Sequence, residues 1–346
     1  MRTINVTASR NYPVMIGAGL LQEAGERIRA AAGGAKACVV TDDHVEPLYA
    51  ERVESGLAAA GYEPLRFVIA HGEASKSPEN YIALLRFLAE NRLTRTDVLV
   101  ALGGGVVGDL TGFAAASYLR GIPFVQLPTT VLAAVDSSVG GKTAIDLPEG
   151  KNLVGAFYQP HLVLCDIDTL ATLPKETFED GFAEVIKYGM LGDPELLRLL
   201  LLPVEDRMEE ILAICVERKR DVVAEDEFDR GKRQLLNLGH TVGHAIEALS
   251  GYRQSHGRAV AAGMCIVTEA AVRHGLCPKE SLDILRRLCE KFELPQTSEY
   301  TVEQMYEVMT ADKKRAGNRI HLIVPNGFGS CEIRSMEITE LKDFLA

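Results

Sequence analysis

The sequence lacks the long apolar run that a membrane span requires. Its longest apolar stretch, residues 98–119, is interrupted by five glycines and by Asp109. Residues 1–17 alternate between apolar and polar side chains as a strand does, and they lack the continuous apolar core of a signal peptide. These two absences predict a cytoplasmic protein with no membrane partner.

Paired cysteines and an excess of cations are also missing. The seven cysteines include no C-x-x-C pair, and their odd number favours reduced thiols in a protein interior over a disulfide framework. Lysine and arginine number 37 against 48 acidic residues, a net charge of −11. This balance disfavours nucleic acid as a partner, so any anion site must come from a local cluster of cations. No repeat or low-complexity tract is present.

A length of 346 residues is typical of two domains. The first half alternates short β-branched runs with helical patterns, which indicates βαβ units and a parallel sheet. The strongest helix signal is Ser77 followed by Pro78, an N-cap with proline at the first helical position. Strands are predicted at residues 36–43, 64–70, 96–104, 122–128 and 160–168.

The β-rich runs nearly stop at Pro174, and a helical pattern follows. Thr301 and Gln304 form a capping-box signal before one late helix, and short strands are predicted at 320–325 and 331–335. We therefore predict an α/β fold in two parts. An N-terminal Rossmann-like parallel-sheet domain that binds NAD occupies residues 1–170, and a mainly α-helical domain that binds metal and substrate occupies residues 171–346.

Residues Gly103–Gly108 fit the pattern G-x-G-x-x-G between a strand and a helix, where bare backbone can approach a pyrophosphate. The acidic residue that usually follows about 20 positions later is missing, although Asp42 could bind the ribose hydroxyls instead. The polar loop at 72–76 offers Lys76 for a phosphate and Glu73 for a ribose. A glycine turn without ligand and a solvated loop remain the alternatives.

The densest run of polar residues and glycines lies at 136–146, followed by Gly150, Lys151 and Asn152. Lysines beside glycines can reach an anion without steric cover, and Asp136 could accept hydrogen bonds from sugar hydroxyls. The run is not a P-loop, because Asp136 stands where that motif has its first glycine. An ordinary surface loop is the alternative.

Three of the eight histidines, His240, His244 and His256, lie within seventeen residues. His240 and His244 are four residues apart and share a helix face, as zinc ligands often do. Upstream, Glu184 and Lys187 share a helical face among apolar residues, where a buried charge needs an ion as partner. The alternatives are a local ion pair and core histidines. Spacing alone does not select which two histidines join Glu184.

In chain order the sequence contains GEASKS, GGGVVGDLTGF, LPTT, DSSVGGKTAID, GKN, GFAEVIKYG, LNLGHTVGHAIE and HGRAVAAGM. Over nearly its whole length it closely resembles the 3-dehydroquinate synthases of the shikimate pathway, in the sugar phosphate cyclase superfamily. The resemblance implies NAD and a divalent metal, zinc or cobalt. It assigns the metal to Glu184, His240 and His256, and turns His244 toward the substrate phosphate.

The resemblance also implies the remaining contacts. Cofactor contacts match Asp42, Glu73, Lys76, Gly104, Gly105, Asp109, Thr129, Thr130, Lys142, Lys151, Thr169 and Thr172. Substrate groups match Asp136, Lys142, Asn152, Lys187, Lys219, Arg233, Asn237 and His244, with Arg120 reaching across the interface of a homodimer. One of Lys313 and Lys314 should also contact the substrate. His44 and His71 stand where relatives often carry other polar residues.

The implied substrate is a phosphorylated sugar acid, 3-deoxy-D-arabino-heptulosonate 7-phosphate, and the products are 3-dehydroquinate and phosphate. This lyase reaction oxidises C5 with NAD, eliminates phosphate, reduces C5 again, opens the ring and closes a carbocycle by an aldol step. NAD should therefore act catalytically.

Three other functions were weighed against this one. A cyclase for a neutral sugar phosphate would leave Arg233 and Lys219 without a carboxylate to bind. A metal-dependent polyol dehydrogenase would explain the glycine turn but not the GGKTAID and GKN segments, and it would accumulate NADH. A binding protein without activity would not need the full set of metal ligands and lysines.

Overall fold

The computed structural model describes residues 1–311 and 318–346 and divides the chain into two compact units. The first unit contains Met1–Leu173 and Leu212–Phe228, and the second contains Pro174–Ile211 and Asp229–Ala346. The sequence predicted one crossing near residue 170 and did not anticipate the return of 212–228 to the first unit. The assignment of cofactor to one part and metal to the other remains a proposal.

The strands are β1 Arg2–Val6, β2 Tyr12–Gly17, β3 Lys36–Asp42, β4 Glu63–Ile69, β5 Val98–Gly103, β6 Phe124–Pro128, β7 Lys142–Leu147, β8 Gly150–Phe157, β9 Val163–Asp166, β10 Arg319–Gly327 and β11 Ser330–Glu337. The α-helices are α1 Ala24–Ala32, α2 Glu51–Ala59, α3 Pro78–Glu90, α4 Gly105–Ser117, α5 Lys175–Gly192, α6 Pro194–Leu199, α7 Met208–Glu225, α8 His240–Leu249, α9 His256–Arg273, α10 Lys279–Lys291, α11 Val302–Ala311 and α12 Ile338–Leu345.

The first unit is built on a seven-stranded sheet in the order β1-β2-β9-β6-β5-β3-β4. Every pairing from β2 to β4 is parallel, and only β1 runs antiparallel, as a hairpin with β2. The predicted parallel sheet and its five strands are confirmed. The opening segment, predicted as one strand, forms two, because residues 7–11 turn the chain back on itself.

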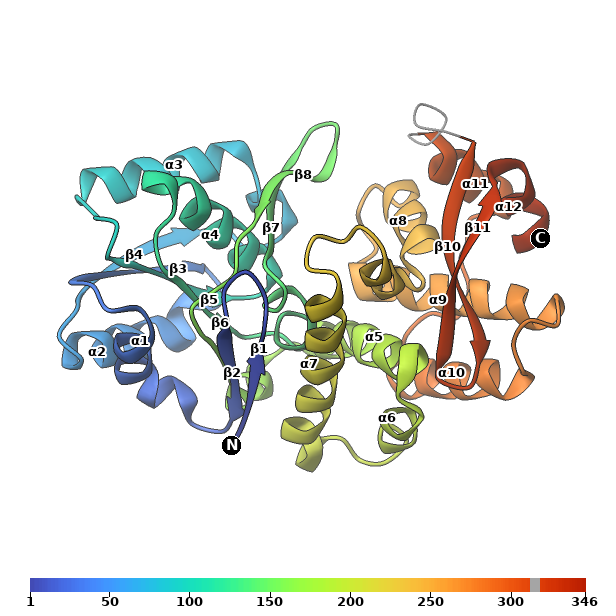
Figure 1. Ribbon diagram of the computed structural model, residues 1–346, viewed down its shortest axis with the longest axis horizontal. Coiled ribbons are helices and arrows are strands. Elements are labelled where there is room, and N and C mark those ends of the chain that lie inside the picture. The colour runs from blue at the N-terminus through green and yellow to red at the C-terminus, as the bar shows by residue number, and fades with distance from the viewer. Residues whose placement is uncertain (312–317) are drawn as a thin grey trace. The chain divides into compact units, whose positions relative to one another are not determined.

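Both faces of this sheet are buried, which explains the nearly continuous apolar runs in its strands. In β5, Val98, Val100 and Leu102 pack into the cluster that contains α1 and α2, whereas Leu99 and Ala101 pack into the cluster that contains α3 and α4. Figure 1 shows the two pairs of helices on opposite sides of the strands. The carboxyl ends of the parallel strands therefore share one edge, where ligands bind in sheets of this type.

A hairpin of β7 and β8 carries the lysine-rich and glycine-rich segments of the first unit. The two strands pair antiparallel with an irregularity between Ile145 and Leu147, and the hairpin projects from the sheet in Figure 1. Asn152 has a φ of 57°, in the left-handed region. Its backbone N–H donates to Asp146 Oδ1 at 2.7 Å, which holds this strained residue in place.

The described part of the second unit is mainly helical, with one antiparallel hairpin, β10–β11. Its apolar core joins α8, α9, α11, α12 and β10, as the buried side chains Val242, Val267, Met305, Leu341 and Leu322 illustrate. The predicted capping box is confirmed, since Thr301 N donates to Gln304 Oε1 at 2.9 Å and Gln304 N donates to Thr301 Oγ1 at 3.3 Å.

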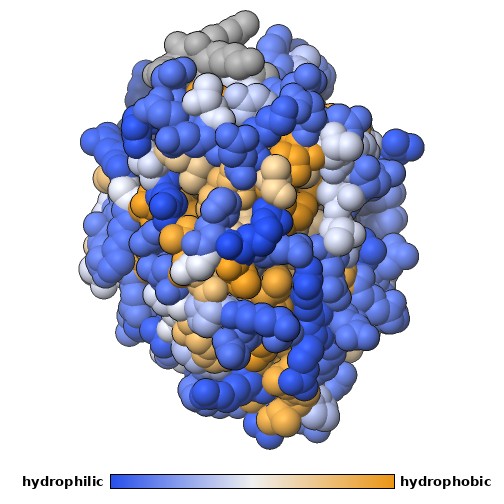
Figure 2. All heavy atoms as spheres, turned by 90° about the vertical axis from the view of Figure 1, so that its right-hand side faces the viewer, coloured by the Kyte–Doolittle hydropathy of each residue, from blue (hydrophilic) through white to orange (hydrophobic). Residues whose placement is uncertain are grey.

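Figure 2 views the molecule from the right-hand side of Figure 1, where hydrophobic side chains gather across the middle of the face among hydrophilic ones. Exposed apolar side chains are ordinary on folded proteins, so this face by itself indicates no partner. None of the helices formed by residues 1–311 and 318–346 combines the length and the apolar character that a membrane span requires.

Candidate functional site

Glu184 lies in the middle of α5 and is fully buried among apolar side chains. One of its oxygens, Oε2, forms an ion pair with Lys187, one helical turn further along. The other oxygen, Oε1, faces two histidines. The two oxygens of the Glu184 carboxylate therefore contact different partners, one a lysine and the other two histidines.

The two histidines come from consecutive helices. His240 begins α8 and His256 begins α9, and their Nε2 atoms lie 3.6 Å and 3.5 Å from Glu184 Oε1. His240 Nδ1 lies 3.1 Å from the carbonyl oxygen of Leu238, which can only accept a hydrogen bond. That contact places the proton on Nδ1 and leaves the Nε2 lone pair pointing toward Glu184.

These three side chains fit a divalent metal. Ligands at about 2.1 Å from a tetrahedral ion are about 3.4 Å from one another, close to the spacing found here. The donor set of two imidazoles and one carboxylate is one of those that catalytic zinc sites use when a fourth position stays open. Glu184, His240 and His256 form one of three potential metal-binding groups among the described residues.

The electrostatics of the two histidines differ. Burial lowers the pKa of His240 to about 3, with a further contribution from the Lys187 cation. Burial also acts on His256, but hydrogen bonds and attraction from Glu184 and Glu247 outweigh it and raise the pKa to about 10.

Glu247 is a residue that the sequence interpretation missed. It is buried on α8, and its Oε2 lies 3.3 Å from His256 Nδ1 and 4.0 Å from His244 Nε2. The contact between the Glu247 carboxylate and Nδ1 of His256 orients the ring so that its Nε2 atom faces Glu184. Its position seven residues after His240, on the same side of the helix, is the signal that could have revealed it.

Replacing Glu247 with alanine should therefore weaken metal binding by about 10- to 100-fold, the usual effect of losing such a partner. Glu247→Gln, which keeps an acceptor oxygen, should lose less. Competition with a chromogenic chelator measures both affinities. Equal zinc affinity in wild type and Glu247→Ala would contradict an orienting role for this carboxylate.

In the first unit, the predicted cofactor residues lie at the carboxyl ends of the parallel strands. Asp42 ends β3, Gly104 and Gly105 follow β5, Thr129 and Thr130 follow β6, and Thr169 and Thr172 lie on the 3-10 helix after β9. Asp42 Oδ1 accepts hydrogen bonds from the backbone N–H groups of His44 and Val45, both at 2.9 Å. Residues far apart in sequence are thus brought to one edge of the sheet.

The turn after β5 leaves backbone uncovered. Helix α4 begins there without a side-chain cap, so its first N–H groups are available to an anion. A Cβ on Gly104 would lie 3.2 Å from Thr130 Cγ2, so a larger residue would crowd the turn. Thr129 Oγ1 is buried and has no hydrogen-bond partner within residues 1–311 and 318–346. These features fit a dinucleotide.

Lys76 links three of the predicted cofactor segments. Its Nζ lies 3.1 Å from Asp109 Oδ2, 3.3 Å from Glu73 Oε1 and 3.9 Å from Asp146 Oδ1. Burial alone would lower the pKa of Lys76, but the carboxylates of Asp109, Glu73 and Asp146 raise it, so the side chain stays cationic. Burial raises the pKa of Asp109 to about 6 despite the lysine. Lys151 Nζ approaches Glu73 from the hairpin at 4.0 Å.

Five predicted substrate residues of the first unit lie on separate elements. Lys219 of α7 donates to Asp136 Oδ1 at 2.7 Å, so one cation and one carboxylate are already paired. Lys142 and Asn152 lie on β7 and β8 and are exposed. Arg120 is also exposed and has a φ of 68°, in the left-handed region.

In the second unit, Lys187 and Arg233 are only 1% and 2% exposed. Cations buried to this extent need anionic or strongly polar neighbours, which makes both side chains suitable for an acidic substrate. Arg233 and Asn237 lie on the 3-10 helix Lys232–Asn237 that precedes α8. His244 is the exposed histidine of the group, with 61% of its side chain accessible. Lys313 and Lys314 lie outside the described residues.

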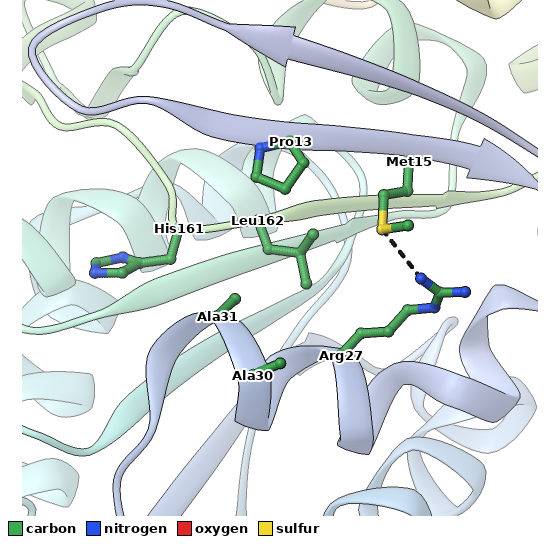
Figure 3. Close-up of a pocket in the computed structure, with 7 residues that line it drawn as sticks. All are labelled: Pro13, Met15, Arg27, Ala30, Ala31, His161 and Leu162. Carbon is green, nitrogen blue, oxygen red and sulfur yellow. Dashed lines mark hydrogen bonds between the residues drawn. The ribbon is translucent and has the colours of Figure 1, made fainter.

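A cavity of about 440 Å³ in the first unit contains none of the predicted site residues. Its lining consists of Pro13, Met15, Arg27, Ala30, Ala31, His161 and Leu162 (Figure 3). Arg27 is occupied, because it donates to Met15 Sδ at 3.3 Å and pairs with Glu23. Burial, aided by Arg10, lowers the pKa of His161 to about 4, so this imidazole is neutral. The cavity lacks groups suited to the predicted chemistry.

Two solved structures share the fold over nearly the whole chain. The 2-epi-5-epi-valiolone synthase of Streptomyces hygroscopicus, with NAD+ and Zn2+ bound, has a TM-score of 0.87 at 25% identity and covers 100% of this chain and 98% of its own. A 2-deoxy-scyllo-inosose synthase complexed with carbaglucose-6-phosphate, NAD+ and Co2+ has a TM-score of 0.86 at 24% identity, with 99% of both chains covered. By its fold the chain is similar to α/β enzymes of the sugar phosphate cyclase type.

Sequence comparison narrows this class to one family. Residues 66–180 match the family model for the N-terminal part of 3-dehydroquinate synthase, and residues 181–315 match the model for its C-terminal part. The 3-dehydroquinate synthase of Streptococcus suis is 43% identical over 342 residues, which is 96% of each chain. The chain belongs to the 3-dehydroquinate synthase family and is an enzyme of that kind.

Proposed function

We propose that the protein converts 3-deoxy-D-arabino-heptulosonate 7-phosphate into 3-dehydroquinate and phosphate, with NAD and a divalent metal. The observation that carries this proposal is the spacing of Glu184 Oε1 from His240 and His256, which fits a metal site with an open position. A metal held by Glu184, His240 and His256 would supply polarisation of the C5 oxygen, and bound NAD would supply reversible hydride transfer at C5.

The residues of the first unit bind and orient the substrate and the cofactor. Lys142 and Lys219 attract the substrate carboxylate, and Asp136 accepts hydrogen bonds from the sugar hydroxyls. Asn152 donates to the phosphate from the hairpin turn that Asp146 holds. The cofactor is held by Asp42, Glu73, Lys76 and Asp109, by the backbone of Gly104 and Gly105, and by Thr129, Thr130, Lys142, Lys151, Thr169 and Thr172.

The residues of the second unit supply metal ligands and cations. Glu184, His240 and His256 hold the metal. Arg233 pairs with the substrate carboxylate, while Lys187, Asn237 and His244 bind the phosphate group. Oxidation at C5 acidifies the C6 hydrogen, and the departing phosphate can itself take that proton. The elimination thus requires no additional carboxylate base.

The family resemblance supports a homodimer in which Arg120 of one copy reaches the substrate of the other. The neighbouring Leu119 is apolar and 39% accessible. A cytoplasmic location is the remaining part of the proposal. The seven free cysteines, six of them buried, are typical of a reducing compartment.

Phosphate release from the heptulosonate phosphate, measured with zinc and with NAD far below the substrate concentration, tests this function. We expect many phosphates for each NAD and no lasting NADH absorbance, because the reaction returns each hydride. Removal of zinc with a chelator should stop phosphate release. NADH formed in stoichiometric amounts from a polyol, without phosphate release, would identify a dehydrogenase instead.

A further inference from the structure

Two consecutive glycines lie between two of the proposed substrate residues, Asp136 and Lys142. The φ angles of Gly140 and Gly141 are 92° and 71°, in the left-handed region, which residues with a Cβ rarely adopt. A glycine backbone has many accessible conformations, so contacts from other residues must hold this turn in one of them. Lys142 follows directly and is exposed, and the backbone of the turn therefore sets the direction of its long side chain.

Tyr12 holds the first glycine. It begins β2, 128 residues earlier in the chain, and is only 2% exposed. The backbone N–H of Gly140 donates to Tyr12 Oη at 3.0 Å in a buried environment. Such a hydrogen bond is costly to lose, because water does not replace the missing partner. The β1–β2 hairpin thus supplies the acceptor that fixes the backbone at Gly140.

Gln159 packs against the second glycine and links it to Glu227. A Cβ on Gly141 would lie 2.7 Å from Gln159 Cδ, so this buried amide lies directly on the glycine backbone. Gln159 Nε2 donates to Glu227 Oε1 at 2.9 Å. The Glu227 carboxylate also accepts hydrogen bonds from the backbone N–H and the hydroxyl of Ser9, at 2.7 Å and 2.5 Å. Glu227 therefore ties the amide that supports Gly141 to the turn between β1 and β2.

Helix α7 supports both ends of the segment 136–142. Lys219, on the helix, pairs with Asp136 at the start of the segment, with 2.7 Å between Nζ and Oδ1. Glu227, two residues beyond the end of the helix, supports the other end through the buried amide. These contacts give a physical reason for the return of residues 212–228 to the first unit.

We propose that Tyr12 and Glu227 are positioning residues, which hold the two-glycine turn so that Lys142 is directed toward the substrate carboxylate. This inference rests on the proposed function, in which Lys142 attracts that carboxylate. Neither Tyr12 nor Glu227 belongs to the residues proposed to contact metal, cofactor or substrate, so both act through the backbone that carries Lys142. Loss of either side chain should therefore weaken substrate binding more than it slows the chemistry at C5.

Steady-state kinetics of Tyr12→Phe, with zinc and saturating NAD, tests the proposal, because this change removes only the oxygen to which Gly140 donates. KM for the heptulosonate phosphate should rise about tenfold while kcat stays within about twofold of wild type, since the lost contact acts on binding. Glu227→Ala should give the same pattern. Glu227→Gln, which keeps one acceptor oxygen, should give a smaller rise.

Tyr62→Phe is the matched control. Tyr62 is also buried in the first unit, and its hydroxyl donates to the carbonyl oxygen of another glycine, Gly33. The control loses the same chemical group from the same kind of contact, but at a place remote in sequence from Lys142. Its KM should equal that of wild type, and an equal rise in both tyrosine variants would contradict a specific role for Tyr12.

Combination with Lys142→Ala shows whether the tyrosine acts through the lysine. Lys142→Ala should itself raise KM, and Tyr12→Phe should add little to that rise, because residues that act as one unit are not additive. Fully additive effects of the two changes would contradict the positioning role. A wild-type KM in Tyr12→Phe would contradict it as well.

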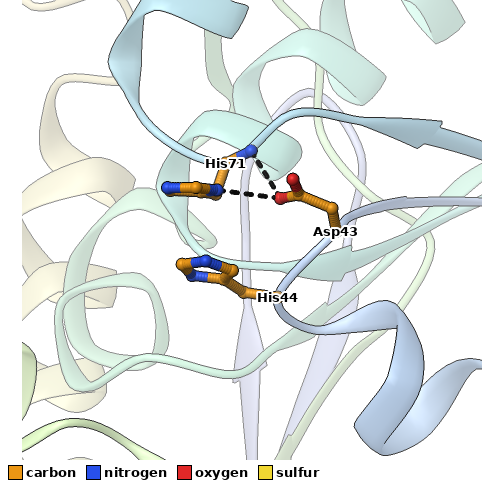
Figure 4. A group of neighbouring side chains, drawn as sticks. All are labelled: Asp43, His44 and His71. Atoms are coloured by element: carbon orange, nitrogen blue, oxygen red, sulfur yellow. Dashed lines mark hydrogen bonds and ion pairs between the residues drawn. The ribbon is translucent and has the colours of Figure 1, made fainter.

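Hydrogen exchange followed by mass spectrometry tests the same contacts without the reaction. Tyr12→Phe and Glu227→Ala should speed exchange at residues 140–142, whereas the control variant should not. The loop of His71 is an internal reference, because its N–H donates to Asp43 Oδ1 at 2.8 Å in the same unit (Figure 4), and it should exchange equally in all variants. Unchanged exchange at the glycine turn would overturn the proposal. A wild-type enzyme that releases no phosphate would instead refute the proposed function, and the exchange rates would still decide whether the two side chains hold the turn.

Discussion

Glu184→Gln is expected to lower phosphate release by about a thousandfold, which corresponds to about 4 kcal/mol of transition-state stabilisation. The amide has nearly the same shape as the carboxylate but carries no charge. It therefore binds a divalent cation poorly and leaves the Lys187 ammonium, with which Glu184 now pairs, without its counter-charge. Both losses fall on the second unit, so NAD binding should persist.

Three measurements separate this effect from simple unfolding. Zinc content should fall, NAD binding followed by fluorescence should remain, and thermal melting should show a folded protein. Glu179→Gln makes the same chemical change on the same helix, at a buried carboxylate whose partner is Lys175 at 3.4 Å, and should keep its zinc. Full activity with retained zinc in Glu184→Gln would show that our ligand assignment is wrong.

Local signals were sufficient to predict five strands of the parallel sheet in the first unit. The strands in the parallel sheet are buried on both faces, so residues such as Val98, Leu99 and Val100 form the unbroken apolar run that this environment requires. The glycines at 103–105 follow directly, where the strand must turn into α4. In contrast, no strand was predicted for the GGKTAID segment, although it forms much of β7, because its glycines hide the short strand.

In the second unit, local sequence patterns could not predict which residues far apart in the chain lie in contact. The spacing of His240 and His244 favours them as a pair, and both do lie on α8, but the Nε2 atom of His256 on α9 approaches Glu184 with that of His240. Which residues meet depends on how α5, α8 and α9 pack. Only the family resemblance supplied that information before the structure, and it gave no hint of Glu247.

Packing of α8 against α9 depends on glycines. A Cβ on Gly263 of α9 would lie 2.2 Å from the carbonyl oxygen of Gly239 and 2.9 Å from the backbone nitrogen of Gly243, closer than real Cβ atoms come. Gly239 itself has a φ of 79°, in the left-handed region, at the start of α8. The close approach of the two backbones is what brings His240 and His256 to the same carboxylate.

Gly263→Ala should therefore destabilise the protein by about 1 to 3 kcal/mol or more, since inserted volume in a packed interior forces backbone to move. It should also weaken zinc binding, because the displaced helices carry one histidine each. Thermal melting and chelator competition measure the two effects. The control is Gly192→Ala at the end of α5, where a Cβ would meet no atom within 4 Å. The control should melt at or above the wild-type temperature, because alanine favours helix.

The two readouts for Gly263→Ala distinguish two roles of this glycine. If the variant loses stability but binds zinc as wild type does, the packing of α8 on α9 determines the stability of the fold. The histidines are then positioned by Glu184 and Glu247 alone. If the variant melts at the wild-type temperature, α8 and α9 can move apart at no cost in free energy of unfolding. The close approach of the two helices is then not required for stability. A loss of both would mean that the metal ligands depend on the same backbone contact that holds the unit together.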